Sequence, residues 1–369
     1  MIIECCKINQ NSKYIEENII KIKDWNQFIN LAYAHGVFQL VYHGIKKNHS
    51  LIPKNILKKF QYYNMQIVKQ NMLMTAELIK IIKLLEVNGI NVIPFKGPVL
   101  SQLAYGDVTL RQYVDLDILV KKNELNTIIN ILKNNAYSKL YTEADFKHVF
   151  FDLSHDLSLL SHNNIKFEFH WRLLNDNYLT NLNSIDILQN PIRVKLHNYT
   201  ITTFSNEIYL IYLSVHGSKH NWERIEWLLD IVYLIKSNSL DWEACYRLIK
   251  ISNCENIVLT TLKLSHDLFE LNLNDDLLKK INEKKISQYS RRLKKEIFNN
   301  FFNVTLANEK KATLLQLELI EGFKNKFLFI FSRFEPNKSE FNLIKLPKYL
   351  GFIYYIIRLV NILRNILKR

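Results

Sequence analysis

The stretch that decides the fold class is RQYVDLDILV, at residues 111–120. Its apolar residues predict a β-strand, and in a strand residues i and i+2 point to the same face. Asp115 and Asp117 therefore point together, opposite to the aliphatic residues that alternate with them. Two ionised carboxylates about 5 Å apart repel each other by roughly 3 kcal/mol at an effective dielectric constant near 20. We expect a divalent metal ion as the counter-charge, and the alternative is a solvent-facing pair neutralised by Arg111.

A third acid lies further along the chain in FEFHWRL, at residues 167–173. Glu168 alternates there with aromatic residues, which predicts another strand. Neighbouring strands lie about 4.8 Å apart, so Glu168 can complete a triangle of carboxylates with Asp115 and Asp117. Metal ions held by such a triangle activate an attacking hydroxyl and neutralise a triphosphate. These three acids are our predicted catalytic and metal-binding residues.

The surrounding sequence predicts an α+β protein built from three regions. Residues 1–88 have helical periodicity, residues 89–204 alternate short strands with helices, and residues 205–369 are again mostly helical. In the middle region we expect helices at 98–105 and 123–134, strands at 91–95, 114–120, 137–141, 149–151, 156–161 and 166–170, and a hairpin of 192–196 with 199–203. The expected architecture is a mixed sheet with flanking helices, placed between helical N- and C-terminal regions.

The composition limits the location and the partners. The 369 residues carry a formal net charge of +14, which attracts phosphates, nucleic acid or anionic lipid. The four cysteines have no CxxC spacing and are too few for a disulfide scaffold, which predicts reduced thiols in a cytoplasmic protein. Glu4 stands where an export signal would be apolar. The apolar run at residues 349–357 is about half of the ~20 residues that span a bilayer, so we expect no transmembrane helix.

Several motifs together carry a family resemblance. They are FKGP at 95–98, RQYVDLDILV at 111–120, EFHWRL at 168–173, HGSKHNW at 216–222, and Trp227 with Asp230. Through them most of residues 30–270 resembles the uncharacterised nucleotidyltransferase family of the polymerase-β superfamily. The resemblance implies a minimal palm domain, a nucleoside triphosphate such as ATP as substrate, and Mg²⁺ or Mn²⁺ as cofactor. It gives the metal-binding role to Asp115, Asp117 and Glu168.

The predicted phosphate site follows the first strand of the middle region. Superfamily members usually present a Gly-Ser or Gly-Gly turn to the phosphates, whereas this chain has Gly97-Pro98 and therefore lacks one backbone donor. The candidates for binding phosphate are Lys96, Gly97 with the amides after it, Ser101 and Arg111. The alternatives are that Lys96 neutralises the acid cluster and that Arg111 pins the acidic strand.

Further polar and aromatic residues follow the third acid. The candidate cleft or acceptor residues are His170, His216, His220, Trp222 and Asp230. His170 shares a strand face with Glu168. The next two histidines lie four residues apart on a helical face that we expect to continue through Glu223, Trp227 and Asp230. These residues either line the cleft opposite the sheet or make polar contacts within the helices. A zinc site would need a third ligand, and none has the expected spacing.

The leading hypothesis is a Mg²⁺-dependent nucleotidyltransferase that moves a nucleoside monophosphate from an NTP to an acceptor hydroxyl and releases pyrophosphate. The acceptor, the NTP and the oligomeric state stay open. The Gly-Pro turn motivates an alternative, a nucleotide-binding regulatory or antitoxin-like partner protein without turnover. A third hypothesis is a membrane-surface scaffold acting through residues 345–369, which alternate apolar and basic residues. No stable nucleic-acid partner is predicted, since the basic run 279–295 lacks interleaved aromatics that stack on bases.

Overall fold

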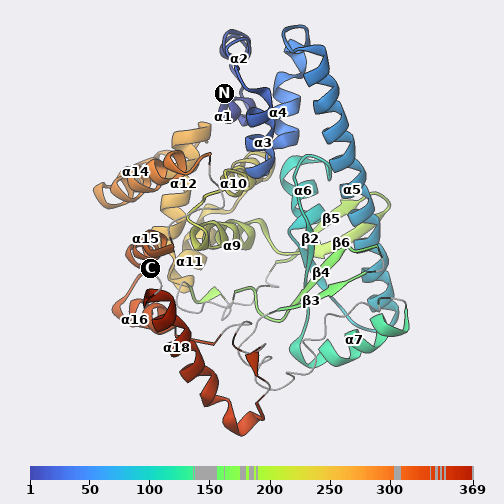
Figure 1. Cartoon of the computed structure of the whole chain (residues 1–369), viewed down its shortest axis with the longest axis vertical. Helices are drawn as coiled ribbons and strands as arrows, with labels where there is room; N and C mark the ends of the chain where they lie inside the picture. Colours follow the sequence, from blue (N-terminus) through green and yellow to red (C-terminus); the bar gives the residue numbers. More distant parts are fainter. Residues whose placement is uncertain are drawn as a thin grey trace.

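The predicted α+β class is confirmed by the computed structural model, in which helices surround a small mixed sheet (Figure 1). The structure describes residues 1–135, 137, 156–161, 163–174, 180–182, 187, 190–302, 309–332, 334–336, 340, 343–344 and 346–367. The predicted strands at 137–141 and 149–151 lie outside these residues, apart from Tyr137, which is not in a strand.

The central sheet has four strands in the order β1-β2-β4-β3. They are β1 (Ile93–Phe95), β2 (Asp115–Leu119), β3 (Asp156–Leu160) and β4 (Lys166–His170). The acidic strand β2 runs parallel to β4 and antiparallel to β1, and β3 is antiparallel to β4. The four strands expected at these places are confirmed. Because β2 lies between β1 and β4, its side chains are flanked by residues from both neighbours.

A separate two-stranded hairpin, β5 (Ile192–Leu196) and β6 (Tyr199–Thr203), is also confirmed. The connection has two residues, and His197 adopts a left-handed backbone conformation with φ 51°. Left-handed residues are what the tight turns of β-hairpins require. The predicted helices of this region are α6 (Gly97–Tyr105) and α7 (Leu125–Asn134), the latter preceded by a single 3-10 turn at Lys122–Glu124.

The N-terminal region is helical, as expected. Its elements are α1 (Ile2–Cys6), α2 (Ser12–Ile19), α3 (Trp25–Ala34), α4 (Phe38–Ile45), a 3-10 helix (Lys46–Leu51) and α5 (Lys54–Val87). Helix α5 is 34 residues long and runs past the sheet along one side of the molecule (Figure 1). It therefore links the N-terminal helices to the sheet.

Two hydrophobic cores lie on opposite faces of the sheet. Leu116 and Ile118 of β2 belong to a core with the second half of α5, with α7 and with the β5–β6 hairpin. Leu119 belongs to the other core, in which the N-terminal helices pack together with the C-terminal ones, including α1 against α12. The alternation predicted for β2 is confirmed, and Asp117 points to the face of the second core. The division at residues 88 and 204 stays a prediction, and these cores cut across it.

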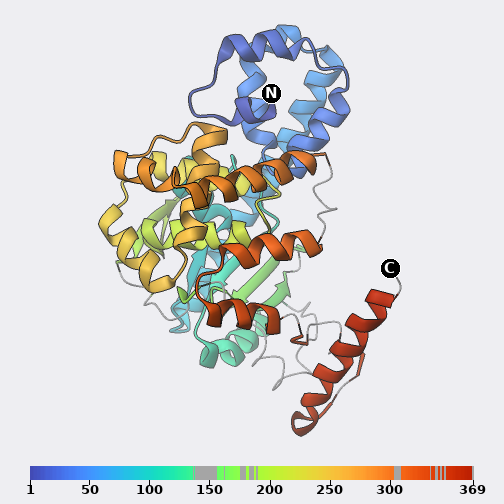
Figure 2. The same cartoon turned by 90° about the vertical axis from the view of Figure 1, so that its left-hand side faces the viewer.

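The C-terminal region is mostly helical. Its helices are α9 (Asn206–Lys219), α10 (Glu226–Ser237), α11 (Trp242–Ser252), α12 (Glu255–Phe269), α13 (Asp275–Ile281), α14 (Lys284–Asn299), α15 (Glu309–Leu319), α16 (Phe323–Ser332) and α18 (Phe352–Leu367), with a 3-10 turn at Lys348–Leu350. Figure 2 shows α18 standing apart from the other helices. Among the described residues, no helix has the length and apolar character needed to cross a bilayer.

The expectation of one helical face from His216 to Asp230 is wrong, because the chain breaks between α9 and α10. Asn221 and Trp222 both have a left-handed backbone, with φ 50° and 49°. The break turns the Trp222 ring back onto α9, where it is fully buried against Gly217. A glycine is needed there, since a Cβ on residue 217 would lie 2.5 Å from the Trp222 Nε1 atom.

We expect Gly217→Ala to destabilise the protein by about 1–3 kcal/mol, because the buried indole must move to admit the methyl group. Urea unfolding followed by circular dichroism measures this free energy. Lys250→Ala, on an exposed position of α11, is the control and should change it by less than about 0.5 kcal/mol. Equal stability of Gly217→Ala and the control would contradict the packing argument.

Candidate functional site

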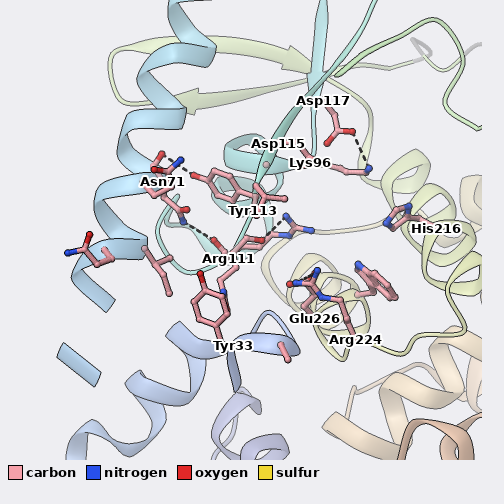
Figure 3. A pocket seen from close by; sticks show the side chains of 18 residues that line it. Tyr33, Asn71, Lys96, Arg111, Tyr113, Asp115, Asp117, His216, Arg224 and Glu226 are labelled. Carbon is pink, nitrogen blue, oxygen red and sulfur yellow. Dashed lines mark hydrogen bonds and ion pairs between the residues drawn. The ribbon is translucent and has the colours of Figure 1, made fainter. Parts of the chain in front are cut away.

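A cleft of about 660 Å³ opens between the acidic strand and the helices α3, α5, α9 and α10 (Figure 3). It has the size of ordinary small-molecule sites, which measure about 300–1,000 Å³. Its walls carry Tyr33, Ala34, Gln66, Ile67, Gln70, Asn71, Lys96, Gly97, Arg111, Gln112, Tyr113, Val114, Asp115, Asp117, His216, Arg224, Glu226 and Trp227. Six of the predicted site residues line it: Lys96, Gly97, Arg111, Asp115, Asp117 and His216.

The sheet register brings two of the predicted acids side by side. Asp117 of β2 pairs with Glu168 of the parallel strand β4. The carboxylate of Asp117 is buried, and its Oδ1 atom lies 2.9 Å from Nε2 of His170, which lies 3.5 Å from Oε2 of Glu168. In the described part of the chain these three side chains form a group whose ligand atoms all lie within 4.8 Å of one another. The cluster expected from the sequence thus contains a histidine beside two of its acids.

Asp115 lies beside this group without belonging to it. It pairs with Lys166 in the sheet register, is partly buried, and lines the cleft. Burial raises the pKa of Asp115 to about 6, and the charges of Asp117 and Glu168 act in the same direction. Asp115 therefore feels the cluster electrostatically. Val114, expected to point into the opposite core, instead precedes the strand and is exposed at the cleft.

Lys96 supplies the counter-charge that the acids need. Its Nζ atom lies 3.2 Å from Oδ1 of Asp117. Although burial alone would lower the pKa of Lys96, the Asp117 carboxylate and the Tyr212 hydroxyl raise it above its usual range. The backbone of Lys96 has φ 56° and ψ −153°, a conformation that is nearly specific to glycine and costs about 1–3 kcal/mol in other residues. The alternative that Lys96 neutralises the acids is thus what its contacts show.

The charges within the cluster are balanced by hydrogen bonds. Burial lowers the pKa of His170, but its bonds to Asp117 and Glu168 outweigh this and raise it to about 9. For Glu168, burial is overcome by the bonds to His170 and Lys166, and its pKa falls well below the usual range. Both acids that touch His170 are therefore ionised at neutral pH, as metal ligands must be, whereas His170 is protonated and must release its proton before it can bind a metal ion.

Arg111 does not contact Asp115 or Asp117, and it holds the loop that leads into the acidic strand against α10. Its guanidinium binds Asp230 of α10 in a bidentate ion pair, with Nε 2.9 Å from Oδ1 and Nη2 3.0 Å from Oδ2. The Tyr105 hydroxyl donates a further bond of 2.9 Å to Asp230. Asp230 is fully buried and serves to hold Arg111 at the edge of the cleft. In Figure 3, Arg111 lies between the acidic strand and α10.

Of the two predicted phosphate-binding residues in the helix after Lys96, Gly97 and Ser101, the first lines the cleft and the second does not. Gly97 lines the cleft, and Pro98 occupies the first turn of α6, where a missing N–H breaks no helical bond. Ser101 is fully buried, and its hydroxyl donates a 2.7 Å bond to the carbonyl oxygen of Asp107. Ser101 thus fastens the loop after α6 and does not line the cleft, because the helix turns this side chain inward.

The predicted histidines and tryptophan are divided between cleft and core. His216 lines the cleft, where burial and then the charge of Lys96 lower its pKa well below the usual range. His220 does not line it, and its ring packs on Trp227 with centroids 4.9 Å apart. Trp222 is core. His216 is therefore a neutral imidazole at the wall opposite the acids.

Two charged residues of this wall, Arg224 and Glu226, were not singled out from the sequence. Nη2 of Arg224 lies 2.9 Å from Oε1 of Glu226, which is buried beneath Gly36 of the α3–α4 turn. Burial raises the pKa of Glu226 to about 7. The signal was present in IEWLLDIV at residues 225–232, where two acids four residues apart interrupt an apolar run. Buried acids in such a run need partners.

A family model described as "Uncharacterised nucleotidyltransferase" matches residues 22–270. The chain belongs to this family. The match spans the cleft, from the α3–α4 turn through the acidic strand to α10. No curated protein and no solved structure shows significant similarity to the chain. Family membership suggests transferase activity, and the cleft is where the acids, the basic residues and the matched segment meet.

The acid cluster fits a divalent cation. Oδ2 of Asp117 is buried and has no hydrogen-bond partner among the described residues, although its pKa lies below the usual range. An ionised oxygen without a partner in the interior is costly, and a cation relieves that cost. A ligand set of two carboxylates and one imidazole favours Mn²⁺ or another transition metal over Mg²⁺, because imidazole is a softer ligand than oxygen.

We expect Arg111→Met to destabilise the protein by about 3–5 kcal/mol, because Asp230 would keep a buried charge without its partner. Urea unfolding measures the loss. Arg247→Met is the matched control, since the Arg247–Glu243 pair is exposed and should contribute less than about 1 kcal/mol. The double variant Arg111→Met with Asp230→Leu should recover most of the loss. Equal losses in the two single variants would contradict the ion-pair argument.

We expect Glu226→Gln to stabilise the protein increasingly as the pH rises. The pKa of Glu226 is about 7 in the fold, against an ordinary value of 4.5, so the folded state loses stability as the pH rises through this range. Glutamine removes that loss, and the variant should gain roughly 2–3 kcal/mol on wild type between about pH 4.5 and about pH 8.5. Urea unfolding of the wild type and the variant at both pH values measures this gain in the free energy of unfolding. Glu243→Gln, at an exposed position, should show no such trend, and a pH-independent difference for Glu226→Gln would refute the assignment.

Proposed function

We propose that the chain is a polymerase-β-type nucleotidyltransferase, which transfers a nucleoside monophosphate from an NTP such as ATP to an acceptor hydroxyl and releases pyrophosphate. The observation that carries the proposal is the pairing of Asp117 with Glu168 across parallel strands and beside His170, with Asp117 lining a cleft that also holds basic residues. Membership of a nucleotidyltransferase family supports it. The sheet around the cleft is proposed to be the palm.

Asp117, Glu168 and His170 are proposed to hold a divalent cation, Mg²⁺ or Mn²⁺, with Asp115 as a further ligand. When bound, the cation supplies activation of the acceptor hydroxyl and neutralisation of the phosphates. Asp115 is the least ionised of the acids in the unliganded protein, since its pKa is about 6. Positive charge near Asp115 lowers that pKa and favours its ligand form. Asp117 or Glu168 is the proposed acceptor of the hydroxyl proton.

Lys96, Gly97 and Arg111 are proposed to position the triphosphate. Lys96 is within reach of Asp117 and lines the cleft, so it can turn from the carboxylate to a phosphate oxygen without leaving its site. Arg111 keeps one nitrogen, Nη1, that is not used by Asp230, and among the described residues this nitrogen makes only a 3.4 Å contact to the carbonyl of Gln112. A fixed guanidinium held by a carboxylate loses little entropy on binding phosphate.

The opposite wall is proposed to receive the base or the acceptor. Tyr33, His216 and Trp227 give it aromatic faces, and Arg224 with Glu226 gives it a polar pair. Figure 3 shows this wall facing Lys96 and the two aspartates across the cleft. Aromatic faces with a few polar groups are the usual lining of a nucleotide or small-molecule site.

The proposal is tested by pyrophosphate release with each NTP, Mg²⁺ or Mn²⁺ and a panel of hydroxyl acceptors. We expect Asp117→Asn to reduce release by at least about 100-fold, since loss of a supporting group at a metal site already costs 10–100-fold. Asp276→Asn, at an exposed position of α13, should retain wild-type release.

Binding of NTP by equilibrium dialysis separates this proposal from a regulatory protein. NTP binding without pyrophosphate release under all conditions would favour the nucleotide-binding partner and count against turnover. Release that survives the double variant Asp115→Asn with Asp117→Asn would refute the site assignment.

A further inference from the structure

Helix α18 exposes a continuous apolar face. This face consists of Phe352, Tyr355, Ile356, Leu359, Val360 and Leu363. Their spacing of i, i+3, i+4, i+7, i+8 and i+11 places them on one side of the helix. Each has between 45% and 61% of its surface exposed, although such an amphipathic stripe normally faces a core. The face therefore lacks the cover that its composition requires.

The opposite side of α18 is fastened, which directs the apolar face outward. Nδ2 of Asn361 donates a 3.0 Å bond to Oε1 of Glu340, and Arg358 lies 3.5 Å from the same oxygen. The hydroxyl of Tyr354 donates to the carbonyl of Ile344 and accepts from the amide of Leu346, each at 2.9 Å. Figure 2 shows the helix beside this preceding segment and away from the other helices.

The charged side chains that follow Glu340 are all basic. After Glu340 the sequence contains no acid, and it contains six basic residues, Lys345, Lys348, Arg358, Arg364, Lys368 and Arg369. Arg364 is exposed in the last turn of α18. Long basic side chains beside an apolar face extend their charged ends toward an anionic surface while their stems stay apolar.

We propose that α18 lies in the headgroup region of an anionic lipid membrane, with its apolar face buried among the acyl chains. A basic amphipathic helix with aromatic residues on its apolar side has the composition of such interfacial helices. The helix has 16 residues and contains Arg358, Asn361 and Arg364, so it lies along the surface and does not cross it.

A second copy of the chain is the less favoured occupant. Helix pairs select their partner through opposite charges that flank the apolar seam. The flanks of α18 hold Arg364 and Arg358, of which Arg358 is paired with Glu340, and the helix itself contains no acid, so a second copy would offer Arg364 no opposite charge. An anionic surface offers the complementary charge along the whole helix.

Vesicle sedimentation with the full chain tests the proposal without nucleotide, and so independently of the proposed transferase activity. We expect binding to phosphatidylcholine vesicles that contain phosphatidylserine to exceed binding to pure phosphatidylcholine by at least about tenfold, since each basic residue near the surface contributes about fivefold. The double variant Leu359→Glu with Leu363→Glu should lose at least about tenfold of this binding.

The matched control is Val87→Glu with Ile251→Glu, which places two acids at other exposed apolar residues, 87% and 60% exposed. It changes the net charge equally and should bind like wild type. A second variant, Lys348→Gln with Arg364→Gln, leaves the apolar face intact and should weaken binding to the anionic vesicles, with less effect at high salt. Circular dichroism checks that each variant is folded.

Three results would overturn the proposal. The first is equal binding of the wild type to neutral and anionic vesicles, and the second is an equal loss of binding in the α18 variant and its control. The third is a wild-type protein that binds no vesicles and is a dimer by light scattering, while the α18 variant is a monomer. The last result would assign the apolar face to a second copy of the chain.

Discussion

The buried ion pair between Arg111 and Asp230 is the interaction on which the arrangement of the cleft depends. It joins the loop before the acidic strand to helix α10, and Tyr105 of α6 completes it. Helix α5 holds the same loop from the other side, because Nδ2 of Asn71 donates to the carbonyls of Val108 and Arg111. Sheet, long helix and helical body therefore meet at one loop, and the cleft lies at this junction. This pair, together with the packing of α6 on α10, thus helps to fix the distance between β2 and the wall that carries His216 and Glu226.

The acid cluster shows how a fold accommodates a repulsive group before any ligand arrives. Asp117 shares its Oδ1 between Lys96 and His170, and Glu168 is held by His170 and Lys166. These contacts neutralise the acids, and Lys96, which makes one of them, has a strained backbone with a positive φ. The arrangement leaves Oδ2 of Asp117 free of hydrogen bonds within the described residues. The cluster is thus preformed and has one strong acceptor in reserve.

Much of this was accessible from the sequence, and the failures have physical causes. Periodicity located β2, β4, the hairpin and the long helix, and alternation placed Asp115 and Asp117 on one strand face, because these are local rules. The partner of Arg111 lies 119 residues away, and no local rule reaches it. The inward turn of Ser101 depends on how α6 sits against its loop. The break after α9 depends on two left-handed residues that Trp222 stabilises through packing on Gly217, which is a tertiary effect.

The shared core of the first and the later helices has a consequence for biosynthesis. Helix α1, with the buried thiols of Cys5 and Cys6, packs against α12, which begins at Glu255. At a translation rate of about 5–20 residues per second, the first helix waits roughly 12–50 seconds before its partner has been made. Throughout that time α1 can pack on α4, but the part of its surface that contacts α12 has no cover. The surface between α1 and α12 can therefore form only after residue 255 and the helix that follows it have left the ribosome.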